Sequence, residues 1–117
     1  MKYKFQDYYT VYRSFEVENE AAKYKMSYTY FSYGNVRDQF SHHNGMKFTT
    51  IGSDNDVWSG GNCAVDYGSG GWWYGACHYV NVNGEWASRV VAKGIEWYTI
   101  TGSSDSLDFV ELKLRRM

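Results

Sequence analysis

Residues 24–30 alternate between aromatic or apolar side chains and polar ones, and this pattern constrains the fold more than any other part of the chain. On an extended strand such a sequence places its rings on one face and its polar groups on the other. The same period recurs at residues 15–18 and 46–50, so we predict strands at all three places. Residues 19–23 are compatible with one helical turn, but the flanking alternation favours a hairpin connection.

The aromatic content supports a fold built from strands. Phe, Trp and Tyr make up 20% of the 117 residues, whereas Leu and Ile are scarce, so rings have to form most of the core. Twelve glycines without a proline indicate many tight turns. Further strands are predicted at 95–101 and 107–114, the second with a bulge between Phe109 and Val110 where the apolar positions change face. The sequence thus predicts a single α+β, mostly β domain over residues 1–117, with a twisted antiparallel sheet.

Regular alternation is lost between Gly52 and Gly75, where glycines are mixed with Asp, Asn and Ser. A long irregular segment inside a compact domain is generally either functional or disordered. Three adjacent aromatic residues at 72–74 argue against disorder, because such large rings tend to be buried. We therefore predict a long, structured functional loop region here.

The charge balance and the hydropathy of the chain argue against two classes of partner. Twelve basic and thirteen acidic residues give a formal net charge of −1, without the basic stripe that is typical of nucleic-acid binding. No apolar run is long enough to insert into a membrane. The first ten residues also lack the apolar core of a signal peptide, so we expect either a mature fragment or a protein outside the secretory route.

Asp54 and Asp56 form the sharpest acidic cluster. Two carboxylates two positions apart in a turn can converge on one hard cation, and loop carbonyls can complete its oxygen shell. The segment is not an EF-hand, because Ser59 and Val65 stand where that motif requires Gly and Glu. The alternative is a solvated turn in which Asp and Asn bond the local backbone, and these residues taken alone favour that alternative.

Cys63 and Cys77 are the two cysteines of the chain, and their spacing does not match a zinc motif. Two free thiols are expected in a cytosolic protein, and one disulfide that closes a loop is expected in a secreted one. The residues alone leave both alternatives open.

No catalytic arrangement can be assembled from the sequence. Cys77 and His78 are adjacent, which rarely allows two side chains to converge as nucleophile and base. His42 and His43 precede the turn signal at 44–45, so we expect them in a surface loop and not as metal ligands. The scattered carboxylates do not place a pair for glycoside hydrolysis. We therefore predict that the protein is not an enzyme.

Aromatic residues are frequent after residue 71, and rings combined with a few polar groups can line a sugar pocket. The glycine-rich loop together with His78 offers that mixture. We nevertheless expect most of these rings, Trp97 among them, to lie in the core. The set comprises Trp72, Trp73, Tyr74, Tyr79, Trp86, Trp97 and Tyr98.

Several motifs occur together in a recognisable order. They are HNGMKFTT, SDND, GGNCA, GGWWYGACH, NVNGEW, GIEW and SLDFVELKLRR. In this order they resemble the C-terminal half of fibrinogen-related domains, with the look of the tachylectin and ficolin lectins, and residues 15–31 resemble the segment before that half. The resemblance covers nearly the whole chain. It implies a secreted protein, of which residues 1–117 are one N-terminally truncated domain with a fibrinogen C-terminal-like fold.

The resemblance implies a Ca²⁺ site in the acidic turn of the long loop region. Asp54 and Asp56 match the two side-chain ligands of the calcium ion in the family. The backbone carbonyls of Trp58 and Gly60 match the groups that complete its shell.

The resemblance also implies a ligand pocket, framed by a disulfide between Cys63 and Cys77. The peptide bond between Ala76 and Cys77 matches one that is cis in many members. Lectin members carry a second tyrosine that has no counterpart here, since Val90 and Val91 occupy that stretch. The matching pocket residues are Tyr67, Ala76, Cys77 and His78, with Trp86 and Ala87 as the opposite wall.

The function that the resemblance implies is calcium-dependent binding of acetylated carbohydrate. The expected protein is an extracellular lectin of innate immunity, homo-oligomeric in its full-length form. The alternative is a protein-recognition module for a peptide N-terminus or a receptor, which the absent tyrosine favours. Neither interpretation involves nucleic acid or membrane insertion.

Overall fold

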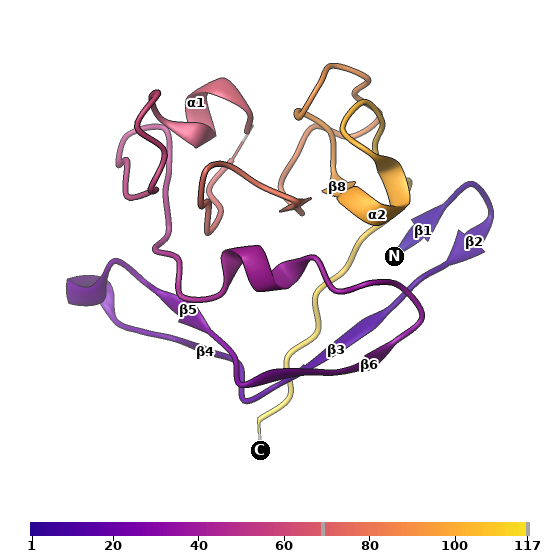
Figure 1. The fold of residues 1–117 in the computed structure, drawn as a ribbon, viewed down its shortest axis with the longest axis horizontal. Coiled ribbons are helices and arrows are strands. Elements are labelled where there is room, and N and C mark those ends of the chain that lie inside the picture. Colours follow the sequence, from indigo (N-terminus) through magenta and orange to yellow (C-terminus); the bar gives the residue numbers. More distant parts are fainter. Residues whose placement is uncertain (69, 117) are drawn as a thin grey trace.

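The computed structural model describes residues 1–68 and 70–116, which form short strands joined by long loops (Figure 1). The strands are β1 (Lys2–Tyr3), β2 (Gln6–Asp7), β3 (Thr10–Arg13), β4 (Glu16–Val17), β5 (Met26–Ser27), β6 (Tyr30–Gly34), β7 (Val80–Asn81) and β8 (Glu96–Trp97). The helical segments are the 3₁₀ turns η1 (Glu20–Ala22) and η2 (Phe40–His43) and the single α-turns α1 (Cys63–Asp66) and α2 (Tyr98–Thr101). The predicted fold class, mostly β with little helix, is confirmed.

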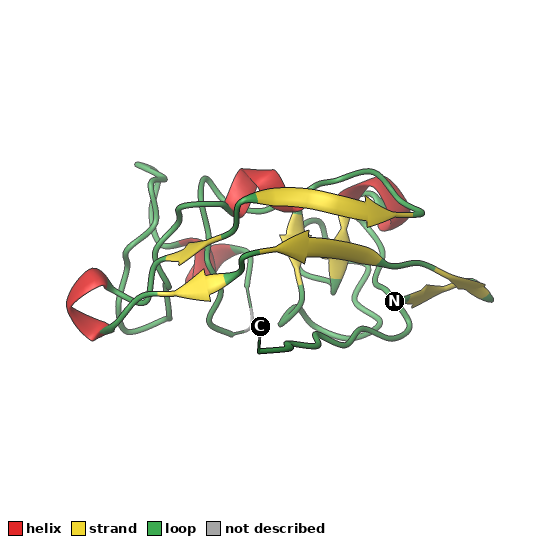
Figure 2. Ribbon diagram, turned by 90° about the horizontal axis from the view of Figure 1, so that it is seen from below, coloured by secondary structure: helices red, strands yellow, loops and turns green. Residues whose placement is uncertain are grey.

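The strands pair antiparallel, as predicted, but in four separate two-stranded sheets among the described residues. The pairs are β1–β2, β3–β6, β4–β5 and β7–β8. The β3–β6 ladder is the longest, and its register shifts between Val11 and Tyr12. Figure 2 shows that the molecule is a thin slab, and its dimensions are 41 × 37 × 18 Å.

The hairpin β4–β5 contains the helical turn that the alternation disfavoured, because η1 lies within the connection. The predicted strand at 24–30 is interrupted at Tyr28, whose backbone N–H and C=O bond the side chain of Asn44 instead of a neighbouring strand. Met26 and Tyr28 point inward as the alternation requires, whereas Tyr24 and Tyr30 are about half exposed. Side-chain competition for backbone groups thus divides one strand into β5 and the start of β6.

Three strand predictions after residue 45 are wrong in whole or in part. At 46–50 the backbone makes only isolated bridges, such as that of Thr49 with Trp72. The segment 95–101 begins as β8 but continues as α2 and ends at a glycine of positive φ. Residues 107–114 contain a single bridge, from Phe109 to Lys2, so the predicted bulge is absent as well. An alternating sequence needs a partner strand, and among the described residues only Glu96 and Trp97 have one here, in β7.

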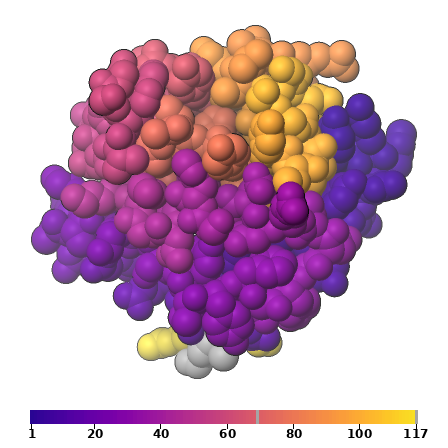
Figure 3. Space-filling view, in the orientation of Figure 1, coloured from indigo at the N-terminus to yellow at the C-terminus, as the bar shows by residue number. Residues whose placement is uncertain are grey.

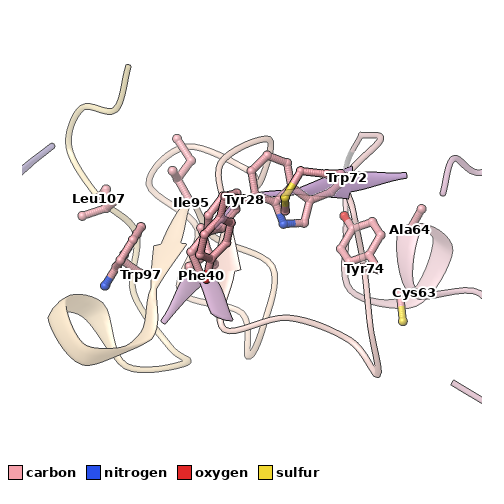
Figure 4. Packing of buried hydrophobic residues seen from close by; sticks show 11 residues of the cluster. Tyr28, Phe40, Cys63, Ala64, Trp72, Tyr74, Ile95, Trp97 and Leu107 are labelled. Atoms are coloured by element: carbon pink, nitrogen blue, oxygen red, sulfur yellow. The ribbon is translucent and has the colours of Figure 1, made fainter. Parts of the chain in front are cut away.

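The core is built largely from rings, as the composition predicted (Figure 4). The rings of Tyr28 and Phe40 stack at 5° with centroids 5.6 Å apart, which joins the N-terminal hairpins to η2. Trp97 is 5% exposed, so its core position is confirmed. The buried apolar residues are Met26, Tyr28, Phe40, Cys63, Ala64, Trp72, Tyr74, Val80, Ile95, Trp97 and Leu107.

The expected surface position of the two adjacent histidines is wrong for His43, which is fully buried in η2. Its Nδ1 lies 2.8 Å from the carbonyl oxygen of Trp73, and its Nε2 accepts the N–H groups of Tyr79 and Val80. Burial lowers the pKa of His43 to about 3, so the ring is neutral. The signal for a turn at 44–45 was genuine, but tertiary bonds draw the preceding histidine inward.

Candidate ligand-binding site

A disulfide joins Cys63 to Cys77, so the bridge implied by the resemblance is confirmed and neither cysteine is free. Cys63 is buried at the first position of α1, whose start is capped by Asn62 through the N–H of Ala64. Cys77 lies in the loop that leads to β7. The bridge therefore holds α1 beside the segment that carries His78.

A cavity of about 230 Å³ lies beside this disulfide. It brings together Tyr67 and the segment Ala76–His78, all expected in a ligand pocket. The peptide bond between Ala76 and Cys77 is cis, as the resemblance implied. The residues that line the cavity are Trp58, Tyr67, Ala76, Cys77, His78 and Ala92.

The aromatic wall of this cavity contains a ring that the sequence did not predict there. The indole of Trp58, a residue expected to contribute only its carbonyl, tilts at 52° to the ring of Tyr67 with centroids 5.4 Å apart. A Cβ atom at Gly60 would lie 2.6 Å from the indole, so the absence of a side chain at Gly60 lets the chain fold back under the ring. The acidic turn and the cavity wall are therefore one local structure.

Trp86 and Ala87, expected as the opposite wall, are not among the described residues that line the cavity. Trp86 is 68% exposed, and its indole N–H donates to the carbonyl of Asp108 at 3.1 Å. Ala92 lines the cavity instead, and its N–H donates to the carbonyl oxygen of Ser103 at 2.7 Å.

The acidic turn is tied to the disulfide by hydrogen bonds. The carboxylate of Asp56 accepts the N–H of Trp58 at 3.0 Å and that of Cys63 at 2.8 Å, and Asp54 accepts the N–H of Asp56 at 3.2 Å. Burial, and then the adjacent negative charge of Asp54, raise the pKa of Asp56. Within residues 1–68 and 70–116, no three His, Cys, Asp or Glu side chains gather as a metal site. The arrangement satisfies the local backbone and also leaves two carboxylates side by side.

His78 is held from both sides of its ring. Its Nε2 lies 2.9 Å from Ala92 O and 3.4 Å from Tyr67 O, and both carbonyls can only accept, so Nε2 carries the proton. Its Nδ1 lies 3.5 Å from the Oε2 atom of Glu96. Burial lowers the pKa of His78 and raises the pKa of Glu96 to about 7.

Sequence reasoning missed Glu96, which it counted among scattered carboxylates. Strand alternation places Glu96 on the face opposite Ile95 and Trp97, yet all three residues are buried. The only signal in the sequence for a buried carboxyl was its position between two core residues. That signal does not reveal which group the carboxyl contacts.

A larger hollow of about 530 Å³ lies where η2, the start of β7 and α2 meet. Figure 3 shows purple, orange and gold segments of the chain converging on this face. None of the residues that the resemblance placed in the ligand pocket lines it, although Tyr79 and Tyr98 belong to the aromatic set considered above for a sugar pocket. Its wall consists of Arg37, Gln39, Ser41, His42, Tyr79, Tyr98 and Thr99.

Among the described helices, none has the length and apolar character to cross a membrane.

Comparisons with known proteins give the family of the chain. Residues 2–117 match the family described as fibrinogen beta and gamma chains, C-terminal globular domain. Fibrinogen-like protein A of Apostichopus parvimensis is 37% identical, over 92% of this chain and 38% of that protein. Techylectin-5A of Tachypleus tridentatus is 39% identical, over 92% of this chain and 37% of that protein.

Solved structures agree with this assignment. The fibrinogen-like globe domain of human ANGPTL2 matches with a TM-score of 0.83 and 38% identity, over 92% of this chain and 50% of that one. Lamprey fibrin D-dimer, solved with the peptide ligand Gly-His-Arg-Pro-amide, shares the fold with a TM-score of 0.83 at 24% identity, over 92% of this chain and 40% of that one. The chain thus spans half the length, or less, of these relatives. It belongs to the fibrinogen C-terminal domain family.

Proposed function

We propose that this chain is the ligand-binding part of an extracellular, calcium-dependent lectin that recognises acetylated glycans in innate defence without catalysis. The observation that carries the proposal is the cavity at the disulfide, where two rings face the segment Ala76–His78. An acetyl group needs an apolar cup for its methyl and hydrogen-bond donors for its carbonyl oxygen. Trp58 and Tyr67 supply the cup. The backbone N–H groups of Cys77 and His78 donate to no acceptor in the described part of the chain, so they are available.

Calcium fits the acidic turn by the chemistry of its donors. Asp54 and Asp56 place two carboxylates next to each other, and no cation of the described residues pairs with them. A hard divalent cation takes oxygen ligands of this type, with backbone carbonyls such as those of Trp58 and Gly60 completing the shell. Bound calcium would neutralise the two adjacent negative charges. Since Asp56 also accepts the N–H of Trp58, the turn that it stabilises carries the aromatic wall.

The proposal includes several copies of the site in one assembly. A single small cavity that holds an acetyl group is expected to bind near the millimolar range, about −4 kcal/mol. Multiple sites on one oligomer raise the avidity without any new contact. Techylectin-5A, a relative whose name marks it as a lectin, supports a carbohydrate ligand.

The test compares two aromatic residues on an N-acetylglucosamine resin in calcium buffer. Tyr67→Ala removes a ring that lines the cavity, so retention should fall at least tenfold. Trp86→Ala removes an exposed ring outside the cavity and serves as the matched control, so retention should be unchanged. If Trp86→Ala abolishes retention and Tyr67→Ala does not, the acetyl site lies elsewhere.

A protein ligand is the second candidate. The observation that favours it is the exposed position of Trp86, which does not line the cavity. The cavity is lined instead by the rings of Trp58 and Tyr67 and by the small side chain of Ala92. Such a cavity also fits the start of a peptide, and the lamprey fibrin structure holds a peptide ligand. If wild-type protein is not retained by the acetylated resin but binds a peptide with a free N-terminus, this alternative is established.

A further inference from the structure

Glu96 has a buried carboxyl group that does not line the ligand cavity, so it has no direct role in the proposed binding. Its side chain is 2% exposed, and its Oε1 atom has no hydrogen-bond partner in the described residues. An isolated carboxylate in such surroundings is unfavourable, so a compensating group is required. The group it faces is Nδ1 of His78, 3.5 Å from Oε2, and that nitrogen is also without a hydrogen bond.

The orientation of the imidazole requires a proton between these two atoms. Because Nε2 of His78 donates toward the carbonyls of Ala92 and Tyr67, the neutral ring presents a lone pair at Nδ1. An ionised Glu96 presents a lone pair as well, and two lone pairs at this distance repel. One proton, held by Oε2 or by Nδ1, converts the repulsion into an attractive contact.

We propose that Glu96 is a positioning residue for the ligand cavity, because a proton shared with His78 fixes the ring that forms part of the cavity wall. The inference rests on the proposed function, since it assigns the pair to the same site. Glu96 touches no ligand in this account; it acts through the ring. Loss of the shared proton leaves two acceptors facing each other, and the ring then has to turn or move.

The direction of the pH dependence follows from the groups around the pair. Burial raises the pKa of Glu96 to about 7, so the proton leaves as the pH rises through that value. Burial lowers the pKa of His78, its contacts with the carbonyls of Ala92 and Tyr67 oppose that shift, and a protonated His42 would lower it further. The nearby His43 is neutral because burial keeps its pKa at about 3. The ring of Tyr74 packs 6.0 Å from His78, and burial raises its pKa to about 12, so it stays neutral as well.

The first experiment observes the pair without any ligand. Imidazole ¹⁵N NMR between pH 5 and 9 should show His78 protonated at Nε2 and a coupled change at Nδ1 near pH 7. Glu96→Gln should abolish that change, because the amide has no proton to lose in this range. Glu85→Gln removes an exposed carboxylate from the neighbouring loop and should behave as wild type.

Identical titration of His78 in wild type and in Glu96→Gln overturns the proposal. If Glu96→Gln does not fold, wild type alone decides: an unshifted Glu96 carboxyl, titrating near pH 4.5, overturns it equally.

The second experiment measures the Kd of N-acetylglucosamine at pH 6 and pH 8. If only the proton-bearing pair is competent to bind, wild-type affinity should fall about tenfold between these values. Glu96→Gln should change less than twofold over the same interval. Affinity of wild type that is equal at both values contradicts the role in positioning. If the sugar binds at neither pH but the coupled NMR change remains, the ligand is not an acetyl group. The shared proton between His78 and Glu96 is then still supported.

Discussion

At the scale of single residues, buried polar groups decide how this chain folds. His43 connects η2 with the loop before β7, because one ring bonds the carbonyl of Trp73 and the N–H groups of Tyr79 and Val80. Such a ring is tolerated inside only while each nitrogen has a partner of the right kind. The partners require Nδ1 to donate and Nε2 to accept, which describes a neutral imidazole.

Acid should therefore destabilise the protein through His43. Its pKa is about 3 in the folded chain and about 6.5 in the unfolded chain, so below about pH 6.5 the unfolded chain binds a proton that the folded chain rejects. The stability contributed by His43 is complete above pH 6.5. It should decline toward pH 3, with a slope of up to about 1.4 kcal/mol per pH unit.

Urea unfolding between pH 4 and 8 measures this slope, and imidazole NMR identifies its source. In the folded protein, the His43 imidazole should stay neutral down to about pH 4. The variant His42→Gln removes the signal of the neighbouring histidine and so assigns that of His43. A His43 ring that titrates between pH 6 and 7 in the folded state would show that it is not buried and bonded in this way.

At the scale of elements, the sequence predicts structure where neighbours in the chain decide it. The alternation around β4 and β5 predicts their hairpin correctly, because the two strands pair with each other across a short connection. The same period fails at 107–114, since a strand there needs a distant partner that the described residues do not supply. It also fails at Tyr28, where the side chain of Asn44 replaces the ladder. Periodicity reports which faces are apolar, whereas pairing depends on contacts that no local pattern encodes.

The disulfide is the connection between α1 and the cavity loop, so its removal should loosen both. Replacing both Cys63 and Cys77 by Ala opens the loop between them, whose ends are 14 positions apart in the sequence. The loss should lower the free energy of unfolding by about 3 kcal/mol. Urea unfolding would show the loss as a lower free energy of unfolding, with a larger m-value because the opened chain unfolds to a more expanded state. Equal midpoints for the oxidised protein and the double variant would contradict a stabilising bridge.

At the scale of the whole molecule, the site is made from segments that are far apart in the sequence. Trp58 and Tyr67 come from the loop region around α1, whereas Ala92 and Glu96 come from after β7. Motif resemblance identified Tyr67 and the segment 76–78 because they lie in a recognisable order. It did not identify Ala92 or Glu96, since their positions depend on how the loop after β7 folds back across the molecule.

Calcium should stabilise the entire fold if the acidic turn binds it. A ligand that binds only the folded chain raises the unfolding free energy by about 2.7 kcal/mol at a concentration of 100 times Kd. Asp54→Ala should remove this increment, and Asp7→Ala, which alters an exposed carboxylate in β2, should retain it. Thermal unfolding in calcium and in chelator provides the measurement. A wild-type Tm that is the same in both buffers would count against the site.

Amide NMR with N-acetylglucosamine tests whether an acetyl group occupies the cavity at the disulfide. In calcium buffer, we expect saturable shifts centred on Tyr67, Cys77 and His78, with a Kd near the millimolar range. Glucosamine, which lacks the acetyl group and carries an ammonium in its place, should cause no such shifts. Equal shifts with both sugars, or shifts centred on Trp86 and Ala87, would contradict an acetyl site in this cavity.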